Sequence, residues 1–191
     1  MEQIILASTS PRRKALLKKA GIKFQVVDSG LKEYLDPKLK PHALVEKLSS
    51  QKAKAVYEKF KDKIIIAADT LVAYDGKILG KPKDREDARK MLEFLSGKTH
   101  LIITGLTIIN PKTQKITIKS EETKITMREI TKEEIDSYLK TKEPFDKAGA
   151  YAIQGIAKKF ITKIDGDLPN AIGLPVNTIL KELRKLSNES A

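Results

Sequence analysis

The most apolar run in the chain covers residues 64–68 (IIIAA), and the acidic residue Asp69 follows it directly. A continuous apolar run rich in β-branched side chains is typical of a strand that is covered on both faces. Such strands lie inside sheets that pack against helices. The run therefore predicts a central strand over residues 64–68 and an α/β fold.

Helix and strand signals alternate on both sides of this run. Ser10 followed by Pro11 predicts the start of a helix, and Gly21 predicts its end. Asp75-Gly76 predicts a hairpin turn, and residues 131–134 (TKEE) predict a capping box. Strands are predicted at 3–7, 24–27, 64–68, 71–74, 77–79, 100–109, 115–118, 124–130 and 157–164, and the longer helices at 11–20, 41–60, 84–95 and 175–186. Mixing of helices, strands and hairpins predicts a mixed sheet.

Length and composition limit the class of protein. The 191 residues suffice for one domain or two closely packed lobes, and we expect a single domain over 1–191. The absence of cysteine excludes disulfides and thiolate metal sites, and two histidines disfavour a histidine-built metal site. The apolar stretch at 4–7 is too short for a signal peptide, and no long apolar run follows. We therefore expect a cytoplasmic protein that does not associate with membranes.

The charge balance favours anionic partners. Lysine and arginine number 37 against 25 acidic residues, a net charge of +12. This suits nucleotides, nucleic acid or acidic lipid, but a lysine-rich solvated surface explains it equally well. A basic nucleic-acid-binding module is one alternative, although aromatic residues make up only 5% of the chain.

A first candidate site lies at residues 8–13 (STSPRR), where a predicted strand ends and a helix begins. Free N–H groups at a helix start attract phosphate, and Arg12 and Arg13 add planar guanidinium groups. Cations are unfavourable in the first turn of a helix, and a bound anion would reverse that penalty. Ser8 and the two arginines are therefore candidate phosphate ligands. The alternative is an ordinary helix with two solvated arginines.

A second candidate is Asp69, a carboxylate at the end of a buried strand. Such a group is costly unless it is paired, metal-bound or exposed in a cleft, and Thr70 offers a hydroxyl beside it. Lys52 falls in the apolar stripe of the helix predicted at 41–60, at helical spacing from Leu48 and Val56. The alternatives are a loop aspartate that caps a local amide and a lysine that snorkels from a helix edge.

Two further segments contain candidate residues. Lys81 stands between Gly80 and Pro82, which would present it rigidly, although a plain surface turn has the same pattern. Residues 143–155 (EPFDKAGAYAIQG) lack helical or strand periodicity and contain Gln154, whose amide could read a base edge or simply be solvated.

Together these motifs resemble those of the Maf family of nucleotide pyrophosphatases. The resemblance runs nearly end to end, through LASTSPRR at 6–13, KA at 52–53, AADT at 67–70, GKP at 80–82, LSGKTH at 95–100, EPFDKAGAYAIQG at 143–155 and GLP at 173–175. It implies a mixed, elongated central sheet with helices on both sides, two lobes around a cleft as in Maf and ITPase-like proteins, and a homodimer. The implied reaction is hydrolysis of a nucleoside triphosphate to the monophosphate and pyrophosphate.

The resemblance also implies roles for individual residues. Ser8, Arg12, Arg13, Lys52 and Lys81 resemble the family's phosphate ligands, and Arg12, Thr70 and Gln154 its specificity positions. Asp69 resembles the general base. A divalent cation, Mg²⁺ or Mn²⁺, is implied as cofactor, with Asp69 and Glu33 as metal ligands. Glu33 is placed by its distance along the chain, because Lys32 stands where the family tends to have the first of two acidic residues.

The form of residues 143–155 resembles the family branch that acts on dTTP and UTP. The alternative within the family is a pyrophosphatase for a modified purine nucleotide such as 7-methyl-GTP. Nucleic acid is not required by this interpretation.

Overall fold

The computed structural model describes residues 3–32 and 34–188, which form a seven-stranded sheet with helices. The strands are β1 (Ile4–Leu6), β2 (Phe24–Val26), β3 (Ile64–Tyr74), β4 (Lys77–Leu79), β5 (Thr99–Asn110), β6 (Lys115–Met127) and β7 (Ile161–Asp165). The α-helices are α1 (Pro11–Lys19), α2 (Pro41–Tyr57), α3 (Arg85–Leu95), α4 (Lys132–Tyr138), α5 (Leu168–Ile172) and α6 (Val176–Asn188). Short 3₁₀ helices are η1 (Glu143–Asp146), η2 (Ala148–Ala150) and η3 (Ile156–Phe160).

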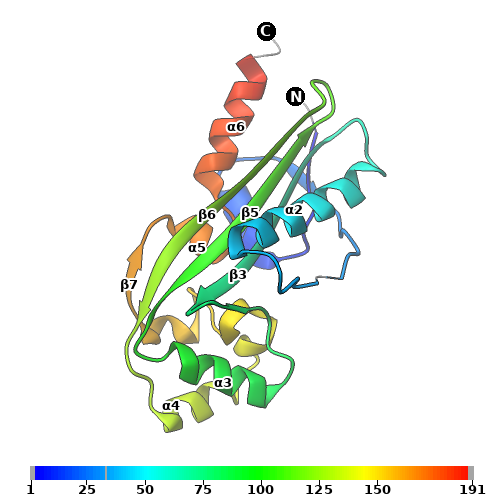
Figure 1. Ribbon diagram of the computed structural model, residues 1–191. Coiled ribbons are helices and arrows are strands. Elements are labelled where there is room, and N and C mark those ends of the chain that lie inside the picture. The colour runs from blue at the N-terminus through cyan, green and yellow to red at the C-terminus, as the bar shows by residue number, and fades with distance from the viewer. Residues whose placement is uncertain (1–2, 33, 189–191) are drawn as a thin grey trace. The chain divides into compact units, whose positions relative to one another are not determined.

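The sheet is mixed, as the sequence predicts. Its strand order is β2-β1-β3-β5-β6-β7, with β4 paired to β3 (Figure 1). β1 runs parallel to both β2 and β3, whereas β4 is antiparallel to β3 and β7 is antiparallel to β6. The α/β class with a mixed sheet is therefore confirmed. None of the described helices has the length and apolar character needed to cross a membrane.

The chain divides into two compact units. The first contains the described residues of Met1–Asp69, Thr104–Glu121 and Gly173–Ala191, and the second those of Thr70–Ile103 and Glu122–Ile172. β3, β5 and β6 each contribute residues to both units.

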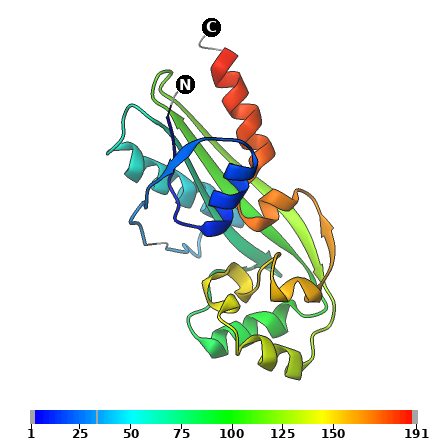
Figure 2. The same cartoon turned by 180° about the vertical axis from the view of Figure 1, so that it is seen from behind.

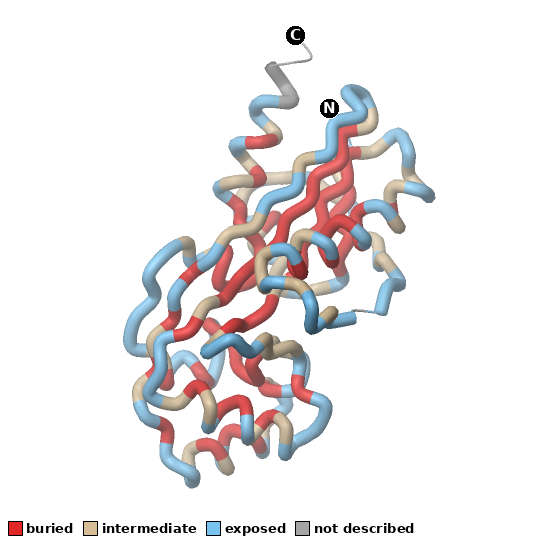
Figure 3. The backbone as a smooth tube through the Cα atoms, in the orientation of Figure 1, coloured by how far each residue is buried: buried red, intermediate tan, exposed pale blue. Residues whose placement is uncertain are grey.

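Unit 1 has a core on each face of its part of the sheet. Successive side chains of a strand point to opposite faces. Ile5, Ile65 and Ala67 accordingly pack against α2, whereas Leu6 and Ile66 pack on the other face against α1 and α6. Figures 1 and 2 show α2 on one side of these strands and α1 and α6 on the other, and Figure 3 shows the strands between them as buried. Helices on both sides of the sheet are thus observed in this unit.

A glycine lets α2 approach β5 closely. A methyl group at Gly105 would lie 2.2 Å from the backbone oxygen of Val45 in α2. Any side chain there would push the helix away from the sheet. Nearby, the Ser49 hydroxyl of α2 hydrogen-bonds the Thr107 hydroxyl of β5 at 2.9 Å. These contacts fix how α2 packs against the sheet.

Unit 2 is held by helix caps and by a small aromatic core. Asp84 caps α3 by accepting from the Asp87 N–H at 2.8 Å, and Thr131 and Glu134 form the predicted capping box of α4. Tyr138 and Phe160 meet edge to face, with ring centres 5.6 Å apart. Both cap predictions are confirmed.

Three strand boundaries differ from the sequence prediction. The strands expected at 64–68 and 71–74 are one strand, β3, and those expected at 115–118 and 124–130 are also one strand, β6. β3 continues because Asp69 has a buried partner and does not need to reach solvent. β6 continues through its charged middle because most of those side chains lie at or near the surface. The strand expected at 157–164 begins only at Ile161, since η3 occupies the preceding residues.

Candidate active site

Two of the predicted functional segments lie near the carboxyl end of β1 in unit 1: residues 8–13 follow β1, and Asp69 stands three residues past Ile66, the β3 partner of Leu6. β1 and β3 are parallel, and Leu6 pairs with Ile66. β1 ends at Leu6, whereas β3 continues, so Asp69 lies just beyond the end of its neighbouring strand. The segment 8–13 leaves β1 at the same level. Side chains beyond the carboxyl ends of parallel strands commonly face a ligand site.

A buried ion pair connects α2 to β3. The Lys52 ammonium contacts Asp69 Oδ1, with side-chain exposures of 9% and 5%. Asp69 shares the face of Ile65 and Ala67, which is the face that α2 covers. The alternation along β3 therefore explains why the carboxylate meets a residue in the apolar stripe of α2. Lys52 is not a lysine that snorkels into solvent.

Ser8 and Arg13 are connected at the start of α1. The buried Ser8 hydroxyl accepts from the Ser10 N–H at 3.3 Å and from Arg13 Nη1 at 3.2 Å. Arg13 Nε also donates to the Gly173 carbonyl at 2.8 Å, just before α6. Ser10 is the N-cap residue, as predicted, but its side chain makes no capping hydrogen bond. No acidic residue stands in the first turn, and Arg12 is half-buried there.

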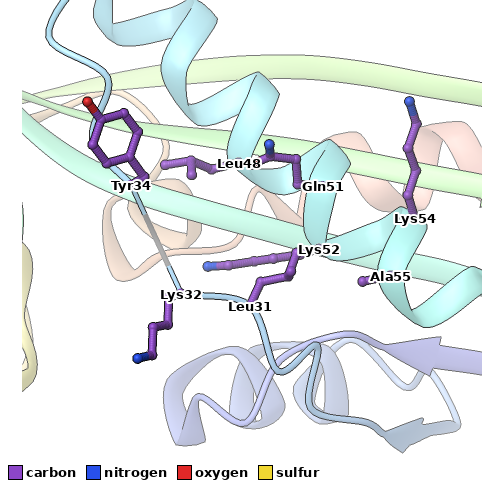
Figure 4. Close-up of a pocket in the computed structure, with 8 residues that line it drawn as sticks. All are labelled: Leu31, Lys32, Tyr34, Leu48, Gln51, Lys52, Lys54 and Ala55. Carbon is purple, nitrogen blue, oxygen red and sulfur yellow. The ribbon is translucent and has the colours of Figure 1, made fainter.

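A pocket of about 360 Å³ opens beside Lys52. Figure 4 shows that one wall is a loop, which supplies Leu31, Lys32 and Tyr34, and that α2 supplies the rest. The residues from α2 are Leu48, Gln51, Lys52, Lys54 and Ala55. In Figure 4 the ammonium group of Lys52 extends toward the loop, whereas those of Lys32 and Lys54 point away from the space between the loop and α2.

In unit 2 the two remaining candidate segments lie together. The Gly149 N–H donates to the Gly80 carbonyl at 3.0 Å, which joins the turn that carries Lys81 to the segment that carries Gln154. Both Lys81 and Gln154 are exposed, and Thr70 is half-buried in β3. The side chains of Lys81 and Gln154 thus lie at the surface of this unit.

A buried histidine lies behind this segment. His100 Nε2 and the Tyr151 hydroxyl are 2.5 Å apart, and the two rings meet edge to face. Burial lowers the pKa of His100 to about 4 and raises the pKa of Tyr151. Both side chains are therefore neutral near pH 7, and the pair anchors the segment without adding charge.

Comparison with known proteins identifies the family. A family model described as Maf-like protein matches residues 3–186. A Bacillus anthracis protein named dTTP/UTP pyrophosphatase is 45% identical over 187 residues, covering 98% of this chain and 97% of that protein. A Bacillus cereus protein of the same name is 46% identical over 185 residues, covering 97% and 96%. The chain belongs to the Maf-like protein family.

Among solved structures, the Staphylococcus aureus Ham1 protein matches with 14% sequence identity and a TM-score of 0.43. The match covers 66% of this Maf-like chain and 72% of the Ham1 chain.

Unit 1 brings Ser8 together with Arg13, and Lys52 together with Asp69. Asp69 lies within β3 and not at the end of a strand, which corrects the sequence expectation. The physical reason is the ammonium of Lys52, which compensates the carboxylate inside the unit. Glu33 lies outside the described residues.

Arg13 also makes hydrogen bonds within the chain that bear on its predicted role as a phosphate ligand. Its guanidinium donates to the Gly173 carbonyl and to the Ser8 hydroxyl. These acceptors relieve part of the penalty for a cation at a helix start, so a bound anion is not needed to explain the residue. Gly173, which supplies one of them, appeared in the sequence only as part of the GLP motif.

The next question is which side chains could bind a metal ion. Within residues 3–32 and 34–188, no group of three or more histidine, aspartate or glutamate side chains is arranged to bind a metal ion. Mg²⁺ is commonly held by one or two carboxylates together with substrate phosphates and water. Asp69 is a buried carboxylate within β3, and Lys52 contacts one of its oxygens. Asp69 can therefore supply one carboxylate to a cation that a nucleotide also binds.

The ion pair predicts a large effect on stability. Replacing one partner removes the opposite charge from a buried ion pair, which typically costs about 3–5 kcal/mol. We expect Lys52→Met to lower the free energy of unfolding by that amount in urea titrations. Lys47→Met is the matched control on the same helix, because the Lys47 pair with Asp36 is more exposed than the Lys52–Asp69 pair and should contribute much less. Equal losses in the two variants would show that the Lys52–Asp69 pair is not desolvated.

The low pKa of His100 predicts a pH dependence of stability. The unfolded imidazole takes up a proton below pH of about 6.5, whereas the folded one does so only near pH 4. The unfolded state therefore binds more protons in this window, and stability falls as the pH is lowered through it. The contribution of His100 is about 1.4 kcal/mol per pH unit, or about 3 kcal/mol in total. Urea unfolding at several pH values should show this slope in wild type and a shallower one in His100→Gln; parallel slopes would contradict the assignment.

Proposed function

We propose that this protein hydrolyses dTTP and UTP to the monophosphate and pyrophosphate by attack of water on the α-phosphorus. One observation carries the proposal: a buried Lys52–Asp69 pair lies in unit 1 just past the level at which β1 ends and residues 8–13 begin. The names of the Bacillus relatives support the substrate, because they match this chain over nearly its whole length.

Phosphate binding falls to the cationic residues and to the helix start. Ser8, Arg12 and Arg13 stand at the N-terminus of α1, where N–H groups and the helix dipole favour anions. Lys52 lines the pocket of Figure 4 and supplies positive charge next to Asp69. We assign Lys81 to the same task. Neutralising the phosphates lowers the barrier because charge moves onto the leaving pyrophosphate.

Asp69 acts as the general base. It takes a proton from the attacking water, whose oxygen forms a bond to the α-phosphorus while the bond from that phosphorus to the bridging oxygen breaks. A carboxylate must be ionised to do this, and a neighbouring ammonium favours the ionised form. Lys52 therefore serves both the base and the phosphates, which is why we regard both as catalytic residues.

A divalent cation, Mg²⁺ or Mn²⁺, completes the proposal. When bound, such a cation neutralises phosphate charge and orients the phosphate oxygens. Asp69 and Glu33 are the proposed protein ligands. Asp69 has the chemistry required and contacts Lys52, one of the residues assigned to the phosphates.

Base recognition is assigned to Arg12, Thr70 and Gln154. The amide of Gln154 both donates and accepts, so a fixed rotamer can match the edge shared by uracil and thymine. Its exposure leaves the amide accessible to a ligand.

Residues 1–191 are proposed to act as one catalytic domain, because the family model extends over residues of both units. The homodimer and a cytoplasmic location stay predictions.

Asp69→Asn should lose turnover. Loss of a general base typically reduces kcat by about 10²–10⁴-fold. Because Lys52 is left without its buried partner charge, the variant should also unfold at lower temperature, so the assay belongs at a temperature where circular dichroism shows it folded. Asp62→Asn, a change in an exposed ion pair, is the control. A folded Asp69→Asn variant with half of the wild-type kcat would exclude Asp69 as the base.

Base selectivity should depend on Gln154. We expect kcat/KM to be high for UTP and dTTP and low for CTP and GTP, because cytosine presents a donor where uracil has an acceptor. One unpaired polar group in a site costs about 1–3 kcal/mol, or roughly tenfold to a few hundredfold. Gln154→Ala should therefore reduce the UTP/CTP ratio, and Gln25→Ala, an exposed change in β2, should not. Preference of the wild type for GTP or 7-methyl-GTP would instead support the modified-purine alternative.

A further inference from the structure

A single carboxylate closes the segment that carries Gln154. Glu143 Oε1 accepts from the Tyr138 hydroxyl at 3.0 Å and from the Ala157 N–H at 3.1 Å, and Oε2 accepts from the Ile156 N–H at 3.0 Å. The first residue of η1 is thus bonded to the first two residues of η3. Nothing in the periodicity of the sequence indicates this contact, because Glu143 reads only as the start of an irregular stretch.

These hydrogen bonds replace a cap that the local sequence lacks. Gly155 is the N-cap of η3 and has no side chain to bond the free N–H groups at the start of the helix. The carboxylate of Glu143 satisfies two of them, and charge-assisted hydrogen bonds of this kind are the stronger ones. Glu143 is therefore the cap of η3, supplied from a distant part of the chain.

The backbone at Gly155 depends on this arrangement. Gly155 has a φ of 126°, a conformation that other residues rarely adopt. A methyl group there would lie 2.3 Å from Glu143 Oε2. The carboxylate and the glycine together define the turn that directly follows Gln154.

The same segment is anchored on its other side. The Gly149 N–H donates to the Gly80 carbonyl, and the Tyr151 hydroxyl contacts His100. Both ends of the short stretch that leads to Gln154 are therefore fixed within unit 2, while the Gln154 side chain itself is exposed. A side chain can discriminate between two bases only if its backbone is held in place.

We infer that Glu143 is a positioning residue for base selection, which acts by holding the backbone on which Gln154 is mounted. This rests on the proposed function, in which Gln154 reads the pyrimidine. Glu143 is not required to touch the nucleotide. Its loss should blur the choice of base and leave the chemistry at the α-phosphorus largely intact.

Glu143→Gln tests the inference. The amide keeps one acceptor oxygen, but its NH₂ group replaces an oxygen that accepts a hydrogen bond in the wild type. That NH₂ group would face another donor, so we expect the turn to loosen. We expect the UTP/CTP ratio of kcat/KM to fall by about tenfold. Hydrolysis of ribose 5-triphosphate, which has no base, should change less than about threefold because it does not use Gln154. Glu133→Gln is the matched control, since Glu133 is exposed in the first turn of α4.

Two further variants cover the case in which Glu143→Gln fails to fold. Gly155→Ala keeps the carboxylate but places a methyl group against it, and Tyr138→Phe removes one hydrogen bond to it. In a folded variant, an equal loss for UTP, CTP and ribose 5-triphosphate would show a purely structural role and overturn the inference. An unchanged UTP/CTP ratio in all these variants, with a reduced ratio in Gln154→Ala, would also overturn it. A wild-type protein that hydrolyses no nucleoside triphosphate would refute the proposed function itself, which is a separate result.

Discussion

The buried ion pair between Lys52 and Asp69 is the interaction on which the arrangement of unit 1 depends. Two charges taken out of water are stable only when their geometry is accurately maintained. That geometry needs α2 to lie close to the sheet, and Gly105 and the Ser49–Thr107 hydrogen bond allow this approach. An apolar pair of similar volume would stabilise the unit equally well, so stability alone does not explain why a charged pair joins α2 to β3.

The start of α1 shows the same combination of structural and functional demands. Arg12 and Arg13 stand where cations are unfavourable, and no acidic residue in the first turn compensates them. The Gly173 carbonyl and the Ser8 hydroxyl bind Arg13 and hold it in place. An arginine oriented in this way loses little further conformational entropy when it binds a phosphate. The structural contacts of Arg13 are therefore compatible with a role in binding.

In unit 2, residues 143–155 are held in place although they contain no strand or long helix. Glu143, Gly149 and Tyr151 each make a contact far along the chain, and together they fix residues that have no strand or long helix to support them. Binding residues often lie on loops that a rigid scaffold positions. In this protein the scaffold consists of individual hydrogen bonds, so single substitutions should change selectivity without changing the fold.

The sequence alone determined the class of the fold, most of its elements and the family. Apolar runs, caps and turn residues are local signals, and they predicted α3, the capping box of α4 and the hairpin at Asp75-Gly76 because the physics of a cap or turn involves only neighbouring residues. The candidate residues Lys52 and Asp69 were also visible, since each carries a charge where the pattern expects none. The tertiary structure decided that these two charges meet, that β3 continues past Asp69, and that Gly173 and Glu143 provide contacts to Arg13 and η3. Those contacts join residues far apart in the chain, and whether a buried charge is compensated depends on which distant element packs against it, which no local pattern contains.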